Sequence, residues 1–338
     1  MKTLSLAYEN ARKASIYKIR KGEDVVMKKY AFGVDIGGTT CKIGFFETAG
    51  VLIDKWEIHT DTTNDGENIL PNVAQAIDNK LAQEGISKSE VQGIGVGVPG
   101  PVTADGVVNR CVNLGWGILD VADILGRLSG LEVKVGNDAN VAALGEMWQG
   151  GAKGCKDVIV VTLGTGVGGG VIVDGKIVAG FNGAGGEIGH ITVNKEELEA
   201  CNCGKYGCLE QYVSATGVVR IAKRKLAQSS DETSLRKFEP LTAKDVFDEA
   251  KAGDAIALEL VDEVGEILGG ALSNMACVVN PEIVVIGGGV SKAGNILTDS
   301  IQKHFVESCF FACRETKFAL ASLGNDAGMY GCVQLLLS

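Results

Sequence analysis

The sequence lacks the features that would assign it to a membrane, to secretion or to nucleic acid. No apolar run reaches the roughly 18 residues of a membrane-spanning helix, and residues 1–28 lack the apolar stretch of a signal peptide. Positive charge is not in excess, because 32 Lys and Arg stand against 42 Asp and Glu, a formal net charge of −10. A protein needs a basic patch to bind nucleic acids or anionic membranes. We therefore expect a cytoplasmic protein with neither partner.

Glycine is in excess, and its placement indicates loops with defined conformations. The 338 residues include 47 glycines, about twice the usual share of ~7%, mostly in short clusters that follow apolar runs. A chain of this length exceeds the ~250–300 residues at which one hydrophobic core stops growing, so we expect two domains.

The order of strand-like segments repeats within the chain. The first series of predicted strands lies at about 30–36, 41–47, 51–58, 93–98 and 132–135. A second series begins in the same order, at 157–163, 168–174 and 176–181. Helical periodicity predicts a helix after Asp65, which would cap it, and a longer helix over 254–279 whose buried stripe includes Val278. The pattern predicts an α/β fold with duplicated mixed sheets covered by helices.

Residues 1–28 are polar and mixed in charge, and they precede an abrupt change to strand-like sequence at Tyr30. We interpret them as an extension outside the fold, too short to fold alone. Met27 resembles a natural start just before the first strand. Either a tag-like or misassigned start, or a functional tail, would explain the extension.

The densest group of metal-binding side chains is His190, Cys201, Cys203 and Cys208, one imidazole and three thiols within nineteen residues. This set favours zinc, and four protein ligands leave no open position for water or substrate, so the zinc would be structural. Disulfides are the alternative, but they are unusual in a cytoplasmic chain.

Two carboxylates flank these ligands. Glu187 lies three residues before His190, and Glu210 lies two residues after Cys208. Metal binding would fix both carboxylates, which could then accept hydrogen bonds from a polyhydroxylated ligand. Because candidate phosphate-binding loops occur elsewhere in the chain, this combination points to a sugar kinase.

Two glycine-rich turns follow apolar strands, and each lets backbone N–H groups approach a phosphate without a side chain in the way. A third glycine cluster follows the buried strand at 283–286, where a nucleotide could meet bare backbone. Hairpin geometry, helix packing and, for Lys42, a solvated surface lysine are the alternatives. The residues that we assign to nucleotide binding are Asp35, Gly37, Gly38, Thr39, Thr40, Lys42, Gly164, Thr165, Gly166, Gly168, Gly288 and Gly289.

Another set of residues could form a sugar pocket. Gly97 and Pro99 end one strand, and Asn113 follows in a loop, although a rigid turn around a buried Trp116 would also explain this segment. Asp138 stands where a helix begins. It can cap that helix, or it can accept the proton of an attacking hydroxyl while Asn137 and Glu187 hold the sugar.

From Tyr30 to its end the sequence resembles the ROK family (repressors, open reading frames, kinases), and within it the bacterial glucokinases. The most specific motifs are Gly186-Glu-Ile-Gly-His190 and Cys201-x-Cys203-Gly-x-x-Gly-Cys208-x-Glu210. Asp35-x-Gly-Gly-Thr39 is similar to the phosphate motif of the actin and hexokinase superfamily. The resemblance implies that Asp138 is the catalytic base, and that the sugar contacts are Asn113, Asn137, Glu187, His190 and Glu210. His190 would give one ring nitrogen to zinc and one to the sugar.

The same resemblance implies a two-lobed, actin/hexokinase-like (ribonuclease H-like) fold around a cleft. The small lobe would comprise residues 29–137 and 325–338, and the large lobe residues 138–324. The implied activity is ATP- and Mg²⁺-dependent phosphorylation of glucose in a homodimer. One alternative is a kinase for N-acetylmannosamine, mannose, fructose or allose. Another is a sugar sensor without catalysis. A third is a repressor of the same family, but we expect that this sequence has no room for the N-terminal winged helix-turn-helix of such a repressor.

Overall fold

The structure is a computed structural model that describes residues 17–20 and 23–338, and its framework is a pair of five-stranded sheets. The first sheet has the order β5-β4-β3-β6-β9, and the second has the order β12-β11-β10-β13-β14. The strands of the first are β3 (Tyr30–Ile36), β4 (Thr40–Glu47), β5 (Val51–His59), β6 (Val91–Val98) and β9 (Val133–Asn137). Those of the second are β10 (Val158–Leu163), β11 (Val167–Val173), β12 (Lys176–Ile177), β13 (Ile283–Gly287) and β14 (Lys317–Leu320).

Both sheets have the same topology. In each, the first three strands form an antiparallel meander, and two further strands add in parallel beside the first strand. The repeated strand order predicted from the sequence is therefore confirmed. The strand expected at 176–181 is shorter, because the chain leaves β12 after Ile177.

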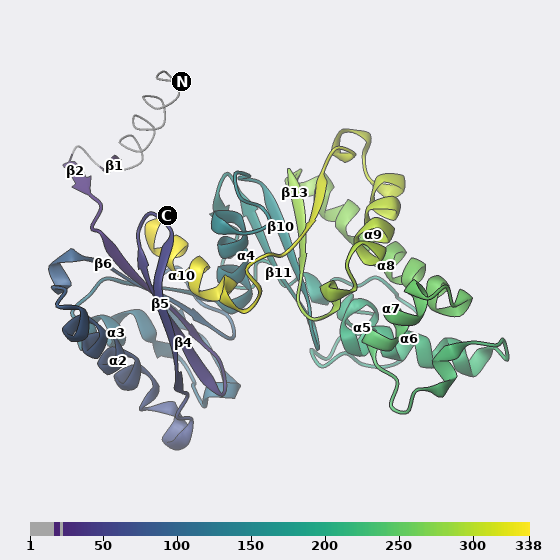
Figure 1. The fold of residues 1–338 in the computed structure, drawn as a ribbon, viewed down its shortest axis with the longest axis horizontal. Helices are drawn as coiled ribbons and strands as arrows, with labels where there is room; N and C mark the ends of the chain where they lie inside the picture. The colour runs from purple at the N-terminus through teal and green to yellow at the C-terminus, as the bar shows by residue number, and fades with distance from the viewer. Residues whose placement is uncertain (1–16, 21–22) are drawn as a thin grey trace.

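Helices cover both faces of each sheet (Figure 1). In the first half of the molecule, α2 (Ile69–Glu84) and α3 (Val121–Ser129) share a hydrophobic core with one face of the first sheet, and α10 (Ala327–Leu337) packs on the other. In the second half, α4 (Asp138–Gln149) packs on one face of the second sheet. The opposite face carries α5 (Glu210–Val213), α6 (Ala215–Gln228), α7 (Ala243–Lys251), α8 (Ala255–Val279) and α9 (Asn295–Ser308).

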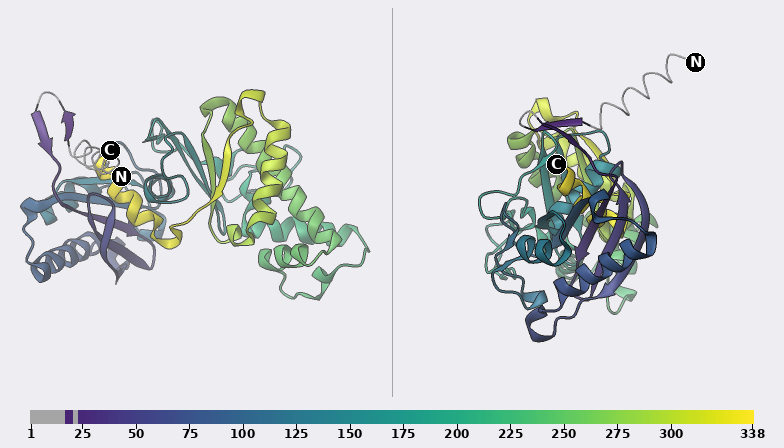
Figure 2. Two further views of the ribbon diagram at one scale, coloured as in Figure 1. Left: turned by 45° about the horizontal axis from the view of Figure 1, so that its top comes forward. Right: turned by 90° about the vertical axis from the view of Figure 1, so that its left-hand side faces the viewer.

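Helices α4 and α10 lie against each other between the two sheets, as the left view in Figure 2 and the contacts agree. Glycines make this approach possible. A Cβ built on Gly331 would lie 1.5 Å from the carbonyl oxygen of Val141, and one on Gly145 would lie 2.1 Å from that of Ala327. No larger residue fits at either position without separating the helices.

The remaining described elements are short. Strands β1 (Tyr17–Arg20) and β2 (Glu23–Val26) pair only with each other among the described strands, in a sheet that stands apart from the other two (Figure 1). Residues 1–16 and 21–22 of the extension predicted at 1–28 lie outside the described residues. Strands β7 (Val107–Val108) and β8 (Leu119–Asp120) form another pair. The 3₁₀ turns are η1 (Thr63–Gly66), η2 (Lys88–Glu90), η3 (Val112–Leu114), η4 (Ile188–His190), η5 (Ser234–Lys237), η6 (Val290–Ala293), η7 (Phe311–Cys313) and η8 (Gly324–Asp326).

Two local expectations are wrong. Asp65 lies in η1 with a positive φ, and the residue before α2 is Asn68, so Asp65 does not cap that helix. Val278 is 83% exposed, whereas Ala276 is buried and Val279 packs against the core, so Val278 lies on the outward side of the last turn of α8. Within residues 17–20 and 23–338, no helix combines the length and the apolar character that a bilayer crossing requires.

Candidate active site

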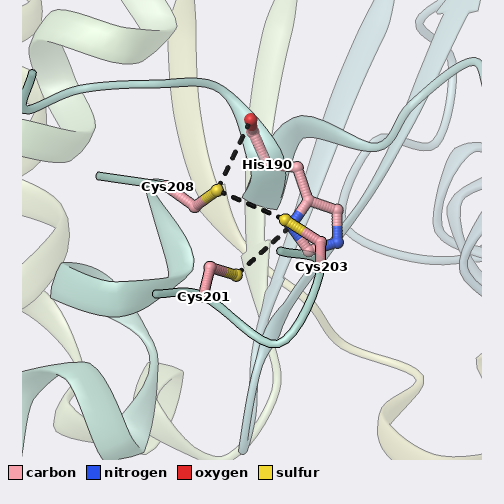
Figure 3. Close-up of side chains that lie close together, drawn as sticks. All are labelled: His190, Cys201, Cys203 and Cys208. Atoms are coloured by element: carbon pink, nitrogen blue, oxygen red, sulfur yellow. Dashed lines mark hydrogen bonds between the residues drawn. The ribbon is translucent and has the colours of Figure 1, made fainter. Parts of the chain in front are cut away.

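The four predicted metal ligands come together at one point (Figure 3). One ligand atom from each of His190, Cys201, Cys203 and Cys208 lies within 4.8 Å of all the others. The Sγ atoms of Cys203 and Cys208 are 3.6 Å apart, and Cys201 Sγ is 3.8 Å from His190 Nδ1. A disulfide would need about 2.05 Å, whereas Zn–S bonds of ~2.3 Å in a tetrahedron place ligand atoms about 3.8 Å apart. The donor set and its spacing fit zinc.

The loop that carries the cysteines is also attached to α6 by a buried ionic network. Glu197 accepts hydrogen bonds from Arg224 at 2.9 and 3.0 Å and from the Tyr212 hydroxyl at 2.6 Å. The Arg224 guanidinium, with help from Tyr212, holds the pKa of Glu197 well below its usual range despite burial. Arg220 approaches the same carboxylate at 2.7 Å. These contacts fix the loop against α6 by means other than the thiol ligands.

Glu210 connects the metal cluster to the turn after β10. It is the first residue of α5, and Cys201 Sγ lies 3.1 Å from its Oε1. A Cβ built on Gly166 would lie 2.6 Å from Glu210 Oε2, so the carboxylate lies directly against this turn. Glu187 is exposed at the start of η4, and the Nδ1 of His190 faces the thiols. The structure thus brings a predicted sugar-binding carboxylate against a predicted phosphate turn.

The turn that contains Gly166 is held by the N-terminus of α6. Gly164 N–H donates to the Gly166 carbonyl at 3.0 Å, and Ala215 N–H donates to the Gly164 carbonyl at 2.8 Å. The Thr216 hydroxyl donates to the Thr165 carbonyl at 2.9 Å. Thr165 itself is exposed. The turn is therefore fixed in place with its tip open to solvent.

In the first half, the turn between β3 and β4 lies beside Asn113. Gly37 N–H donates to the Thr40 carbonyl at 3.0 Å, and the Thr60 hydroxyl donates to the Gly37 carbonyl at 2.7 Å. Thr39 is exposed at the tip. A Cβ on Gly38 would lie 3.8 Å from the Asn113 carbonyl oxygen. The structure therefore places the first predicted phosphate turn next to a predicted sugar contact.

Two carboxyl groups of the candidate site, Asp35 and Asp138, have raised pKa values. Burial raises the pKa of Asp35 to about 6, Lys42 opposes the shift and Asp138 adds to it. Burial likewise raises the pKa of Asp138, against hydrogen bonds from Ala139 and Asn137. Lys42 donates to the carbonyl of Asn325, just before α10, at 3.4 Å. Its nearest hydrogen-bond partner is thus the loop before α10 rather than the turn.

Asp138 is the first residue of α4 and not its cap, which corrects one of the two roles considered from the sequence. The capping residue is Asn137, whose side chain accepts from Asn140 N–H at 3.1 Å. Asp138 Oδ1 accepts from Ala139 N–H at 2.8 Å and from Asn137 Nδ2 at 2.9 Å. Asn137 Nδ2 also donates to the Gly100 carbonyl at 3.1 Å, which links this site to the loop after Pro99.

A cavity of about 310 Å³ lies beside Gly289 and reaches Ala215, the residue bonded to the Gly164 turn. A Cβ on Gly289 would meet nothing within 4 Å, so its backbone is open to the cavity. The sequence did not identify the other walls, because they belong to α7, whose only signals were an amphipathic pattern and a Thr242–Asp245 capping box. The lining residues are Ala215, Thr242, Ala243, Lys244, Phe247, Asp248, Gly289, Val290, Lys292 and Ala293.

Three glycines that we assign to ligand binding also have packing roles. Gly97 is buried, and the place of a side chain there is filled by Val141 and Cys332. Gly168 lies within β11, where a Cβ would be 2.6 Å from Thr162 Oγ1. Gly288 has a φ of +83°, and a Cβ would lie 2.5 Å from the Leu163 carbonyl, so it serves the turn after β13.

Known proteins resemble this chain along most of its length. A glucokinase from Halalkalibacterium halodurans is 47% identical over 308 residues, which cover 90% of this chain and 93% of that protein. The crystal structure of a ROK family glucokinase from Streptomyces griseus, in complex with glucose and AMPPNP, has a TM-score of 0.68 and 32% identity and covers 90% of this chain and 98% of its own. A ROK hexokinase from Thermus thermophilus has a TM-score of 0.73 and 28% identity, covering 90% and 97%.

These structures share the two-lobed, actin/hexokinase-like fold expected from the sequence, with its duplicated mixed sheets. The ROK family matches residues 31–338, which is nearly all of the chain that the structure describes. The chain belongs to the ROK family.

Proposed function

We propose that the protein is a glucokinase, which transfers the γ-phosphoryl group of ATP to the 6-hydroxyl of glucose. The observation that carries this proposal is the contact between Glu210 and Gly166, because it joins a sugar-binding carboxylate to a phosphate turn. The similarity to proteins named glucokinase supports the choice of sugar. The cavity at Gly289 supports a nucleotide as the donor.

In this mechanism Asp138 accepts the proton of the 6-hydroxyl. The oxygen of that hydroxyl bonds to the γ-phosphorus as the bond between the γ-phosphorus and ADP breaks. Phosphoryl transfer depends mainly on position and charge neutralisation, so a carboxylate of modest basicity is sufficient. The hydrogen bonds from Ala139 and Asn137 to Oδ1 leave the second oxygen, Oδ2, to face the hydroxyl. Asn113, Asn137, Glu187, Glu210 and the Nε2 of His190 would hold the sugar.

Metal ions would support this arrangement in two places. A structural zinc would be held by His190 Nδ1 and the thiolates of Cys201, Cys203 and Cys208 and would fix the loop between Glu187 and Glu210. Asp35, buried beside the β3–β4 turn, would hold the Mg²⁺ that neutralises charge on the ATP phosphates. The backbone of the turns at 37–40 and 164–166 would contact the phosphates, with Thr39 or Thr165 as hydroxyl donors.

We assign residues 29–137 and 325–338 to a small lobe and residues 138–324 to a large lobe. The turns at 37–40 and 164–166 would face each other across the cleft between them, and closure of that cleft would exclude water from ATP. The enzyme would act as a homodimer in the cytoplasm.

The test is an ATP-coupled assay of the purified protein across a panel of sugars, with phosphate position determined by NMR. The panel contains glucose, mannose, fructose, allose, N-acetylmannosamine and N-acetylgalactosamine. We expect the highest kcat/KM for glucose, with glucose 6-phosphate as product. Asp138→Asn should lose turnover. Asp120→Asn is the matched control, because Asp120 also lies at a helix start, where its side chain accepts from Asp123 N–H, but away from the proposed site.

Two results would contradict the proposal. Activity restricted to N-acetylated sugars would replace glucose with another substrate of the same site. Sugar binding by calorimetry without turnover of any sugar would make the protein a sensor.

A further inference from the structure

The chain passes between the two halves of the molecule twice, and both connections meet at one buried carboxylate. The first connection is α4, which leads from β9 to β10, and the second is residues 321–326, which lead from β14 to α10. Glu146 lies in the third turn of α4 and is only 2% exposed. It is one of the few charged residues buried among those that the structure describes.

Glu146 binds both connections through backbone N–H groups. Its Oε2 accepts from Gly151 at 2.8 Å, just after the end of α4, and from Ser322 at 3.1 Å. Its Oε1 accepts from Leu323 at 2.9 Å. The two residues of the return connection lie 176 and 177 positions later in the sequence. A Cβ on Gly150 would lie 2.0 Å from Oε2, so glycine is needed to leave room for the carboxylate.

Burial of the Glu146 carboxylate lowers the stability of the folded protein unless all of its hydrogen bonds are kept. A buried carboxylate loses its hydration and is tolerated only when its oxygens accept hydrogen bonds, and bonds to an ionised group are stronger than neutral ones. Loss of the carboxylate would leave the N–H groups of Ser322 and Leu323 without these acceptors. The three bonds therefore hold the end of α4 and the start of the return connection in one fixed relation.

The same helix carries the proposed catalytic base. Asp138 is eight residues before Glu146, which at 1.5 Å per residue is about 12 Å along the axis of α4. Helix α4 packs closely against α10 through Gly145 and Gly331, and its apolar side chains pack on the second sheet. A change of tilt at Glu146 would thus be transmitted to Asp138 at the other end.

We propose that Glu146 is a positioning residue that makes the two connections move as a single hinge. By doing so it sets the geometry in which the turn at 37–40 approaches Asp138 when the halves close. This inference rests on the proposed kinase function for its effect on turnover, and on the hydrogen bonds alone for its effect on closure.

The test compares Glu146→Gln with Glu282→Gln in the full-length protein. Glu282 is the matched control, because its Oε1 also accepts two backbone N–H groups, from Lys156 at 2.6 Å and Asp157 at 3.1 Å, but neither lies in the return connection 321–326. Measurements are Tm, kcat and KM for both substrates, and the radius of gyration by small-angle X-ray scattering, with and without glucose and AMPPNP.

For Glu146→Gln we expect kcat to fall about 10- to 100-fold at temperatures well below its Tm, with smaller changes in both KM values. Compaction on adding the two ligands should be reduced or lost. For Glu282→Gln we expect a lower Tm, with kcat and compaction like those of the wild type. If Glu146→Gln does not fold, Glu146→Asp keeps the charge with a shorter reach, and the same loss is expected.

The proposal is overturned if a Glu146 variant closes and turns over like the wild type. It is also overturned if the Glu146 variants and Glu282→Gln all lose activity only in proportion to their loss of Tm. Failure of the proposed function looks different. In that case the wild type has no kinase activity on any sugar, and the scattering data alone still decide whether Glu146 controls closure.

Discussion

Replacement of Asp35 by Asn should stabilise the ligand-free protein while it removes the proposed activity. Asp35 lies at the end of β3, and burial raises its pKa to about 6 from the ordinary value of 3.8. The folded state therefore holds a proton that the unfolded state releases between about pH 4 and pH 6. Stability falls as pH rises through this window, and above about pH 6 the full penalty is present.

The magnitude follows from the shift. About two pKa units at 1.36 kcal/mol each give a penalty of about 3 kcal/mol at neutral pH. Asn has the same size as Asp and carries no charge, so the penalty is removed. We expect Asp35→Asn to raise the free energy of unfolding by about 2–3 kcal/mol at pH 7.5 and to change it little below pH 4. Activity should be lost, because Asn lacks the charge that would hold Mg²⁺.

The assay is urea unfolding of the ligand-free protein at several pH values, beside a kinase assay. Asp254→Asn provides a control of opposite sign. Burial favours a higher pKa for Asp254, but hydrogen bonds from Ala257, Ser234 and Thr233 outweigh it and lower the pKa to about 2. That variant should lose stability at neutral pH. The reasoning is refuted if Asp35→Asn is less stable than the wild type at pH 7.5, or if its gain does not depend on pH.

Three further predictions concern the base, the metal and the packing of the connecting helices. Asp138→Asn should lower kcat by about 10²–10⁴-fold. Because burial raises the pKa of Asp138, the acidic limb of a pH–rate profile of wild-type kcat/KM should lie above the ordinary pH range for an Asp. Removal of zinc by a chelator, verified by elemental analysis, should raise KM for glucose more than KM for ATP, and equal effects would argue against the assignment of Glu187 and Glu210 to the sugar. Gly331→Ala should lower the free energy of unfolding by about 3 kcal/mol, whereas Gly270→Ala, in open space on α8, should raise it by about 0.5–1 kcal/mol; both are measured by denaturant unfolding.

The sequence was most informative where the relevant residues are close together in the chain. The four zinc ligands lie within nineteen residues, and their spacing alone was enough to predict the cluster that the structure contains. The strand order was predicted for the same reason, because each antiparallel meander is built from neighbouring segments. The helix predicted over 254–279 from its regular period is α8 (Ala255–Val279), and of its predicted buried stripe Val278 is exposed.

The sequence was least informative about glycines and about walls contributed by distant helices. A glycine beside a phosphate and a glycine beside a buried valine look alike in the sequence, so the sequence did not show that Gly97 and Gly168 permit close packing. Phe247 and Thr242 precede Gly289 by more than forty residues, and only the tertiary packing of α7 brings them to one cavity. Contacts between segments far apart in the chain carry no local signal.

The two halves share one framework but contribute different parts of the proposed site. Each half supplies the same element, a turn between the first two strands of its sheet, at 37–40 and 164–166. Only the second half inserts the metal-binding loop after β12, and this loop ends at α5 and α6, whose first residues contact the 164–166 turn. In the proposed site, sugar recognition and one phosphate turn therefore belong to the second half, while Asp35 and Asn113 come from the first. Because neither half would hold a complete site, we expect turnover to depend on how the two connections at Glu146 set the halves against each other.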